Sequence, residues 1–265
     1  MTKVKDKVVW VTGASSGIGE ALALTLVEAG ARVIISARRE AELERVKAAT
    51  SAPDRVAIVP LDLTDLDAMP AKAEEAYAAF GSIDVLINNG GISQRDLALN
   101  TTLEVDERIM KVNYLGTVAL TKAVVPTMAA RKSGHIVTIS SLTGKFGTPY
   151  RSAYAASKHA LHGFFDSLRA ELYEQNVKVL LVAPGFIRTQ ISVNALVGSG
   201  EALGKMDDAQ ANGMPAETCA KIIIKAIERE REEILVGGLR EVAGVYVKRL
   251  FPRLFSRIIR KAKVR

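Results

Sequence analysis

The sequence predicts an α/β fold, in which a doubly wound parallel sheet lies between two layers of helices. Short β-branched and apolar runs alternate with longer segments of helical periodicity along most of the chain. The 265 residues, 48% of them hydrophobic, are enough for one large α/β domain. Strands that alternate with helices pair in parallel, because a parallel neighbour is reached only through a crossover. We therefore expect a three-layer sandwich.

The elements follow from this alternation in order. Seven strands are expected, over residues 8–11, 32–36, 56–59, 85–87, 135–140, 178–182 and 233–236. Helical periodicity begins near Ile18, Glu40, Leu66, Leu103, Tyr154 and Ala216. Residues 185–215 form the longest stretch without a clear strand or long helix, which predicts a lid over a site. We expect one main domain over residues 1–238 and a separate tail over 239–265.

Charge and cysteine content narrow the class of protein. The chain has a net charge of +7, but residues 240–265 contain nine basic residues and only one acid, Glu241, so the remainder is nearly neutral. A nearly neutral body argues against nucleic acid as a partner. The lone Cys219 excludes an internal disulfide and a cysteine-based zinc module. With no apolar run of about 18 residues and no signal-peptide pattern, we expect a cytoplasmic protein.

A glycine-rich turn follows the first strand. The segment reads Thr12-Gly13-Ala14-Ser15-Ser16-Gly17-Ile18-Gly19 and leads into a helical run. Glycines at these positions allow a tight turn and let a pyrophosphate approach the amides at the helix start. The alternative is a plain tight turn, but the strand before it and the helix after it favour a dinucleotide site. The expected contacts are Gly13, Ser15, Ser16, Gly17, Ile18 and Gly19.

The end of the second strand predicts which dinucleotide binds. An NAD site usually has an acid there that accepts hydrogen bonds from the ribose 2′-hydroxyl. This chain has Ala37 near that position, followed by Arg38 and Arg39. A guanidinium group pairs well with a 2′-phosphate, so the sequence favours NADP(H). The alternative is that both arginines are only a solvated helix start.

Three polar residues suggest proton-transfer chemistry. Tyr154 and Lys158 are four residues apart, so on one helix they share a face. A nearby ammonium group, helped by a second cation such as oxidised nicotinamide, is expected to lower the phenol pKa from about 10. Ser141 ends a predicted strand, where its hydroxyl can bond a carbonyl oxygen.

In order and spacing these motifs, together with Asn88-Asn89-Gly90-Gly91, Asn113 and Pro184-Gly185, resemble the short-chain dehydrogenase/reductase family over about residues 5–237. The family has a Rossmann-type fold. Residues 184–195 and the basic tail resemble its branch called dehydrogenase/reductase member seven. One departure is Gly90, where the family usually has alanine, which should loosen that turn.

The resemblance implies a role for each matched residue. Tyr154 would be the acid/base, Ser141 would orient the carbonyl, Lys158 would lower the tyrosine pKa and hold the nicotinamide ribose, and Asn113 would hold a water in a proton relay. The resemblance also implies further cofactor contacts, namely Asp62, Leu63, Asn89, Gly90, Pro184, Gly185, Ile187 and Thr189.

The helix that carries Tyr154 also suggests a partner. It is apolar on more sides than one sheet contact can bury, and together with the helix around residues 113–128 it resembles the family's dimer interface. A homodimer or homotetramer is therefore expected, with burial under the chain's own tail as the alternative. His159, His162 and Asp166 share a broad face of this helix, but without further clustered ligands we expect no metal site.

The tail has an apolar stripe with basic residues among it. The stripe comprises Leu239, Val242, Tyr246, Leu250, Leu254 and Ile258, and Pro252 is expected to break or kink the helix. Such a helix can lie in a lipid headgroup layer, or it can pack on the body or on a partner subunit. The sequence leaves these alternatives open.

The function expected from these features is NADP(H)-dependent interconversion of a carbonyl and a secondary alcohol. Tyr154 is the proton donor or acceptor, and the cofactor supplies the hydride. The apolar composition of residues 185–215 favours an apolar substrate. The alternative is a non-catalytic NADP-binding adaptor that acts through its tail.

Overall fold

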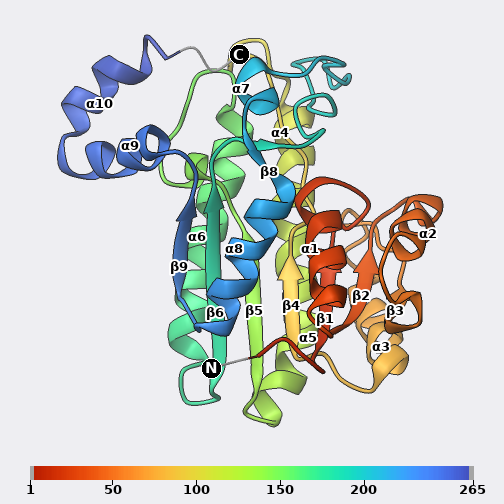
Figure 1. Cartoon of the computed structure of the whole chain (residues 1–265). Helices are drawn as coiled ribbons and strands as arrows, with labels where there is room; N and C mark the ends of the chain where they lie inside the picture. The colour runs from red at the N-terminus through yellow and green to blue at the C-terminus, as the bar shows by residue number, and fades with distance from the viewer. Residues whose placement is uncertain (1–2, 263–265) are drawn as a thin grey trace.

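Seven parallel strands form one central sheet in the computed structural model, which describes residues 3–262. Their spatial order is β3-β2-β1-β4-β5-β6-β9 (Figure 1). The bounds are β1 Val8–Thr12, β2 Arg32–Ser36, β3 Val56–Ile58, β4 Val85–Asn88, β5 Gly134–Ile139, β6 Val177–Pro184 and β9 Glu233–Val236. All seven predicted strands are present, and the doubly wound parallel sheet is confirmed.

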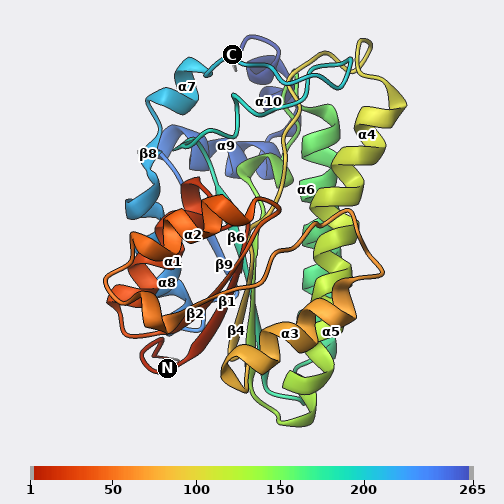
Figure 2. The same cartoon turned by 90° about the vertical axis from the view of Figure 1, so that its right-hand side faces the viewer.

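Helices cover both faces of this sheet, which Figure 2 shows edge-on. On one face lie α1 Gly17–Glu28, α2 Glu40–Ala48 and α8 Ala216–Glu228; on the other lie α3 Met69–Phe80, α4 Leu103–Met110, α5 Thr117–Ala130 and α6 Ser152–Glu171. Neighbouring residues of a strand face opposite layers, so Val9 and Val11 join the α1 and α8 core, while Val8 and Trp10 join the α5 and α6 core. The expected helix starts agree with the structure to within three residues.

The helix expected around residues 113–128 has an irregular start. A π-helical segment, Lys111–Gly116, joins α4 to α5. Gly116 lies against the loop that follows β3. A Cβ atom added to Gly116 would come within 2.2 Å of the Leu63 carbonyl oxygen in that loop. This close approach and the wider turn place Asn113 inside the fold, where it is fully buried.

The carboxyl ends of β1 and β4 form the point where the sheet's winding reverses. β1 pairs with β2 on one side and β4 on the other, so the connections that follow them leave in opposite directions. Ligands bind at such a point in doubly wound sheets. The 185–215 loop lies at the same end. It contains the short strands β7 Ile187–Arg188 and β8 Met214–Pro215, which pair with each other, and the single-turn helix α7 Asp208–Ala211.

The tail forms two helices that follow the carboxyl end of β9 (Figure 1). Helix α9 spans Leu239–Leu250 and α10 spans Pro252–Ile259, so the predicted break at Pro252 is confirmed. Phe255 is buried against Phe146, with ring centroids 5.1 Å apart, and Glu241 accepts a hydrogen bond from the Phe186 amide at 3.1 Å. Within residues 3–262, no helix has the length and apolar character needed to span a bilayer.

Candidate active site

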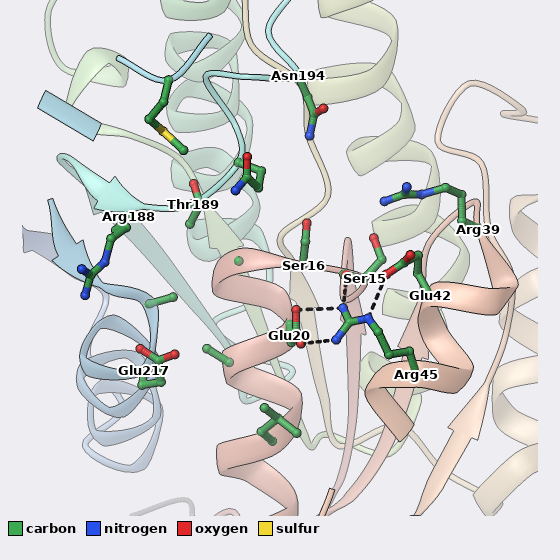
Figure 3. A pocket seen from close by; sticks show the side chains of 16 residues that line it. Ser15, Ser16, Glu20, Arg39, Glu42, Arg45, Arg188, Thr189, Asn194 and Glu217 are labelled. Carbon is green, nitrogen blue, oxygen red and sulfur yellow. Dashed lines mark hydrogen bonds and ion pairs between the residues drawn. The ribbon is translucent and has the colours of Figure 1, made fainter. Parts of the chain in front are cut away.

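The glycine-rich turn has the backbone shape that a phosphate-binding loop needs. Gly13 and Gly17 have φ angles of 62° and 59°, a region that side chains disfavour. Helix α1 begins directly at Gly17, and Ser16 at its N-cap makes no side-chain capping bond. A cleft of about 600 Å³ opens beside this helix start (Figure 3). The turn therefore presents backbone amides and the positive end of a helix dipole to an anion.

Thr12 and Asn89 hold this turn against the end of β4. The Thr12 hydroxyl accepts hydrogen bonds from the amides of Asn89 and Gly90, both at 3.0 Å. The Asn89 side-chain amide donates to the carbonyl oxygens of Thr12 at 3.0 Å and Gly13 at 3.2 Å. The Asn89 side chain therefore fixes the position of the glycine-rich turn, and its expected contact with the cofactor stays a prediction.

The side of the cleft next to α2 is rich in arginine. Arg39 lines the cleft, and both Arg38 and Arg39 are exposed. A further cation, Arg45, lies closer to the turn, donates to the Ser15 carbonyl at 3.1 Å and forms ion pairs with Glu20 at 2.7 Å and Glu42 at 2.9 Å (Figure 3). The pairing with two acids occupies Arg45, which leaves Arg38 and Arg39 as the candidates for a 2′-phosphate.

Asp62 and Leu63 lie at the end of the segment that follows β3. The Asp62 Oδ1 atom accepts hydrogen bonds from the Thr64 amide and hydroxyl, both at 2.9 Å, so the carboxylate stabilises its own turn. Leu63 packs against two glycines. A Cβ atom added to Gly90 would come within 2.7 Å of the Leu63 side chain, and one added to Gly116 would come within 2.8 Å of it. The alanine usual in the family would crowd Leu63 here.

Tyr154, Lys158 and Ser141 meet at the carboxyl end of β5. The Lys158 ammonium lies 5.7 Å from the centre of the Tyr154 ring and donates to the Ile139 carbonyl at 2.8 Å. Burial lowers the pKa of Lys158 to about 8. The Ser141 hydroxyl donates to the Pro184 carbonyl at 3.3 Å and accepts from the Thr143 hydroxyl at 2.9 Å. The neighbouring Ser140 points instead to His162, at 3.0 Å.

Asn113 lies directly behind Lys158. Its side chain exchanges two hydrogen bonds with the backbone of Ile92, at 2.8 and 2.9 Å, and donates to Ser157 at 3.0 Å. A Cβ atom added to Gly91 would lie 3.0 Å from Asn113 Oδ1 and 3.6 Å from Lys158 Nζ, so the two side chains line one small space. The polar atoms of the Asn113 side chain are thus engaged by protein.

The pKa of Tyr154 is set by burial and by charged groups around the phenol. Burial raises the pKa of the Tyr154 phenol above its usual value. Arg95, Ser141 and Arg151 act against this effect and lower the pKa. The Lys158 ammonium lies against the Tyr154 ring and donates to the Ile139 carbonyl. The expected lowering of the phenol pKa by Lys158 together with a bound nicotinamide stays a prediction.

The residues expected near the nicotinamide follow β6. The Gly185 amide donates to the Val236 carbonyl at 2.7 Å, which ties this turn to β9. Ile187 is buried, and its carbonyl accepts a hydrogen bond from Gln210. Thr189 lines the cleft, and its hydroxyl lies 3.3 Å from the Gln210 side-chain nitrogen. Pro184, through its carbonyl, connects this segment to Ser141.

The histidines of α6 have separate partners. His162 contacts Ser140, His159 contacts the Ala155 carbonyl at 2.8 Å, and Asp166 pairs with Arg169 at 2.7 Å. Among residues 3–262, no three His, Cys, Asp or Glu side chains gather in a way that could hold a metal ion.

Comparison with known proteins identifies the family. A family model for the short chain dehydrogenase matches residues 7–197. The chain belongs to the short-chain dehydrogenase/reductase family. It is 49% identical over 97% of its length to an Anopheles gambiae protein named dehydrogenase/reductase SDR family protein 7-like, and covers 83% of that protein. It is 42% identical to dehydrogenase/reductase SDR family member 7B of Rattus norvegicus, with 97% and 81% of the two chains covered.

Solved structures agree with this assignment. A short-chain dehydrogenase of Streptomyces avermitilis superposes with a TM-score of 0.81 at 32% identity, over 98% of this chain and all of the other. A Burkholderia cenocepacia short chain dehydrogenase, solved in complex with NADP, gives 0.79 at 26% identity over 97% and 99%. A Burkholderia phymatum SDR in complex with NAD gives 0.84 at 24% identity, a likeness of fold, over 96% of each chain. The protein is thus an oxidoreductase of the short-chain dehydrogenase/reductase family, whose members act on small-molecule substrates.

Sequence reasoning missed several charged residues near the site. Arg95, Arg151 and Asp207 form a buried cluster beside Tyr154, and Glu241 of the tail contacts the segment after Gly185. One signal was available: Arg151 lies three residues before Tyr154. Asp207 and Glu241 are distant in sequence from the motifs, so only the fold brings them to the site.

Proposed function

We propose that this protein uses NADP(H) to interconvert a carbonyl and a secondary alcohol on an apolar substrate, with Tyr154 as the acid/base. The observation that carries the proposal is the meeting of Tyr154, Lys158 and Ser141 next to a glycine-rich cleft. A non-catalytic adaptor is not favoured, because each position that the family uses for chemistry holds a competent residue.

The residues of the cleft fit a dinucleotide. Gly13 and Gly17 have backbone angles that leave room for a pyrophosphate, and the start of α1 supplies amides to bind it. Arg38 and Arg39 would pair with a 2′-phosphate, and no acid stands at the ribose position. Thr189 would bind the nicotinamide end. When bound, the nicotinamide supplies the hydride.

The protein's own residues handle the proton. Because burial raises the pKa of Tyr154, the phenol is protonated at neutral pH, which is the form that donates to a carbonyl oxygen. The Ser141 hydroxyl orients that oxygen beside the phenol. The Lys158 ammonium, which donates to the Ile139 carbonyl, would bind the nicotinamide ribose and return a proton toward Tyr154.

The test is Tyr154→Phe, which removes the proton-donating group and keeps the ring. NADPH oxidation measured with a panel of apolar ketones and aldehydes should fall by at least a hundredfold, since general acid catalysis contributes about 10²–10⁴-fold. NADPH binding should persist, because the phenyl ring preserves the packing. Activity that is unchanged in this variant would overturn the mechanism.

We also propose that the chain forms a homodimer or homotetramer through α5 and α6. Leu115, in the π-helical segment that leads into α5, is 44% exposed, and a Cβ atom added to Gly163 of α6 would meet nothing within 4 Å. This part of the surface therefore presents small and apolar residues to solvent. Light scattering at micromolar concentration tests the proposal, and a monomer would contradict it.

The lone Cys219 is buried and its pKa is raised to about 12, consistent with the cytoplasmic location that we propose.

For the tail, we propose contact with an anionic membrane surface. The apolar residues Tyr246, Leu250, Phe251, Leu254 and Ile258 are between 49% and 65% exposed although α9 and α10 are folded against the body. Basic residues on the same two helices, including Lys248, Arg249, Arg253 and Arg257, match a negatively charged headgroup layer.

A further inference from the structure

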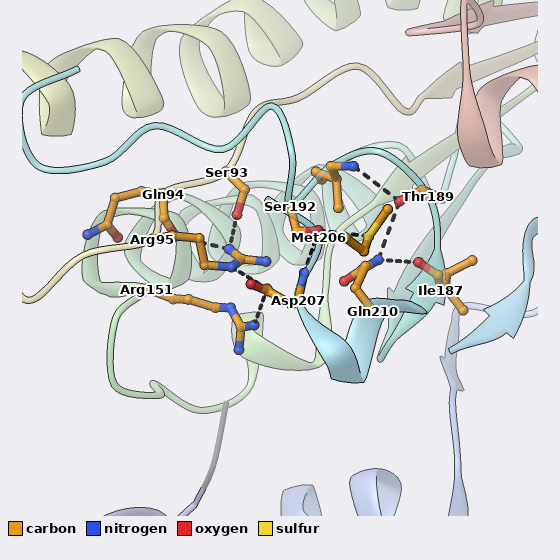
Figure 4. Close-up of polar contacts among 11 residues, drawn as sticks. Ser93, Gln94, Arg95, Arg151, Ile187, Thr189, Ser192, Met206, Asp207 and Gln210 are labelled. Carbon is orange, nitrogen blue, oxygen red and sulfur yellow. Dashed lines mark hydrogen bonds and ion pairs between the residues drawn. The ribbon is translucent and has the colours of Figure 1, made fainter. Parts of the chain in front are cut away.

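The loop over the site carries a buried acid that contacts two arginines. Asp207 Oδ2 lies 2.7 Å from Arg95 Nε and 3.3 Å from an Arg151 side-chain nitrogen (Figure 4). The three side chains are only 3–4% exposed. They come from separate parts of the chain: Arg95 follows β4, Arg151 directly precedes α6 and Asp207 lies in the 185–215 loop. Buried charges persist only where they are paired, so this cluster fixes the loop to the catalytic helix.

Local structure indicates that the Asp207 carboxylate is committed to this cluster. Asp207 is the N-cap residue of α7, where an aspartate normally bonds the first amides of its own helix. Its side chain makes no such bond and turns to the arginines instead. Its backbone is held separately, because the Asp207 amide donates to the Ser192 hydroxyl at 3.3 Å.

Both arginine side chains are held by further contacts. Arg95 donates to the Ser93 hydroxyl at 2.5 Å and to the Gln94 carbonyl at 2.9 Å. Arg151 lies over the Phe186 ring, 5.5 Å from its centre. Tyr150, just before it, has a φ angle of 65°, which bulky residues rarely adopt, so the chain accepts backbone strain at the entry to α6.

The same loop reaches the cofactor side of the site. Gln210, in the single turn of α7 that follows Asp207, bonds the Ile187 carbonyl and the Thr189 hydroxyl. Thr189 lines the dinucleotide cleft. One short segment therefore touches the cofactor cleft at one end and the arginine pair beside Tyr154 at the other.

We propose that Asp207 is a positioning residue through which the 185–215 loop controls how readily Tyr154 gives up its proton. With the loop seated, the carboxylate offsets the charge of Arg95 and Arg151. When the loop moves away, the two guanidinium groups act on the phenol without that offset and favour the phenolate. The inference rests on the proposed role of Tyr154 as acid/base.

Two further charged groups near the active site have contacts of their own. Lys158 faces the Ile139 carbonyl, and Glu241, from α9, lies against the Phe186 amide. Arg95 and Arg151 both lower the pKa of Tyr154, and burial, together with the charge of Arg95, lowers the pKa of Arg151 to about 10. The charges of this cluster therefore influence the pKa of the phenol.

Charge-removing variants test the proposal through their opposite effects. For carbonyl reduction, kcat/KM falls as the pH rises through the Tyr154 pKa. Asp207→Asn should move that fall to lower pH by on the order of one unit, the size expected for one nearby charge at an effective dielectric constant of about 20. Arg151→Gln should move it to higher pH, and the double variant should return toward the wild type. Asp208→Asn, an exposed neighbour on the same loop, should change nothing.

A second readout needs no substrate. The ultraviolet absorbance of tyrosinate is followed as the pH rises, for each protein and for the same protein carrying Tyr154→Phe. The difference between the two curves is the titration of the Tyr154 phenol. A shift of the Asp207→Asn titration to lower pH supports the proposal. An unchanged titration in folded, NADPH-binding protein, or shifts in the same direction for Asp207→Asn and Arg151→Gln, would overturn it. If Asp207→Asn does not fold, the test is the comparison of Arg151→Gln with Arg151→Lys, which keeps the charge. The Tyr154 titration should shift only in Arg151→Gln.

These results remain separable from the proposed function. Activity that Tyr154→Phe abolishes establishes the acid/base role, whatever Asp207 does. If no Tyr154-dependent activity is found, the proposed function fails, and the tyrosinate titration still reports whether Asp207 acts on the phenol.

Discussion

Gly13 and Gly90 are in direct backbone contact: a Cβ atom on Gly13 would lie 2.7 Å from the Cα of Gly90. The phosphate-binding turn after β1 is therefore pressed against the turn after β4. Thr12 and Asn89 hold the two turns together with four hydrogen bonds. The shape of the cofactor cleft thus depends on a contact that only glycine permits.

Gly13→Ala should lower both stability and nucleotide affinity. The φ angle of 62° costs a side chain about 1–2 kcal/mol, and the collision is with backbone, which cannot turn away. Gly204→Ala is the matched control, because Gly204 has a φ angle of 67° with nothing within 4 Å of an added Cβ. Urea unfolding should show a loss for Gly13→Ala at least about 1 kcal/mol larger than for Gly204→Ala. Equal losses would show that backbone angle alone is responsible.

Arg38 and Arg39 should set the preference for NADP(H). Replacing both with aspartate puts negative charge where a 2′-phosphate would lie, and supplies the acid that a ribose hydroxyl prefers. We expect the NADPH dissociation constant to rise at least about tenfold, because a charge-assisted contact contributes about 1.5–3 kcal/mol. The NADH constant should fall. Fluorescence titration measures both.

The control for this pair is the double variant Arg229→Asp and Arg231→Asp, which makes the same change of charge at two exposed positions directly after α8, outside the cleft lining. It should leave both constants unchanged. An NADH preference in the wild type, or a ratio of the constants that the Arg38 and Arg39 substitutions do not change, would contradict the NADP(H) proposal.

How much the sequence predicts depends on the range of the interaction. Strands and helices are local patterns, so all seven strands, the start of α8 at Ala216 and the break at Pro252 agree with the sequence analysis. The positions of Tyr154 and Lys158 on one helix also follow from local spacing. Leu66 is the least accurate helix start, because it lies in a turn in which Asp65 accepts a hydrogen bond from the Ala68 amide, and α3 begins only at Met69.

Interactions across the chain were not predictable in this way. The Lys158 ammonium donates to the Ile139 carbonyl, 19 residues away, a contact that the spacing of Tyr154 and Lys158 does not predict. The Arg95–Asp207 pair joins residues 112 positions apart. The Asn89 side chain bonds the backbone of Thr12 and Gly13 because β1 and β4 are neighbours in the sheet. Such contacts depend on strand order, which single motifs do not encode.

A buried histidine far from the active-site end should limit stability in acid. His135, in β5, is 1% exposed, and burial lowers its pKa to about 4. Neither ring nitrogen has a hydrogen-bond partner among the described residues. Because the folded-state pKa lies below the unfolded value of about 6.5, the unfolded chain gains a proton first as pH falls. Stability from this group is present above pH 6.5 and is lost between about pH 6.5 and 4.

His135→Leu removes this dependence. At pH 7.5 the variant should unfold with a free energy similar to that of the wild type, since no hydrogen bond is broken. At pH 5 it should be more stable by about 1–2 kcal/mol, as measured by urea unfolding at both pH values. His159→Leu, at an exposed position of α6, is the control and should not reduce the difference between the two pH values. The same pH slope in wild type and His135→Leu would refute the explanation.

The tail should bind vesicles that contain anionic lipid. Leu254 and Ile258 on α10 are 49% and 51% exposed, and burying each such side chain in a bilayer contributes about 1–2 kcal/mol. Each nearby lysine or arginine adds about 1 kcal/mol at an anionic surface. In flotation assays, the full chain should move with phosphatidylserine vesicles at low salt, and less so at high salt, which screens the basic residues.

Substituting Leu254 and Ile258 with aspartate should abolish this binding and leave NADPH oxidation intact, because neither residue lines the cleft. Tyr173→Asp is the matched control, since Tyr173 is 79% exposed just beyond the end of α6. If the double variant floats like the wild type, the apolar face of α10 is not what contacts lipid. If the wild type does not float even at low salt, that face is covered by protein instead, and the double variant should then change the oligomeric state seen by light scattering.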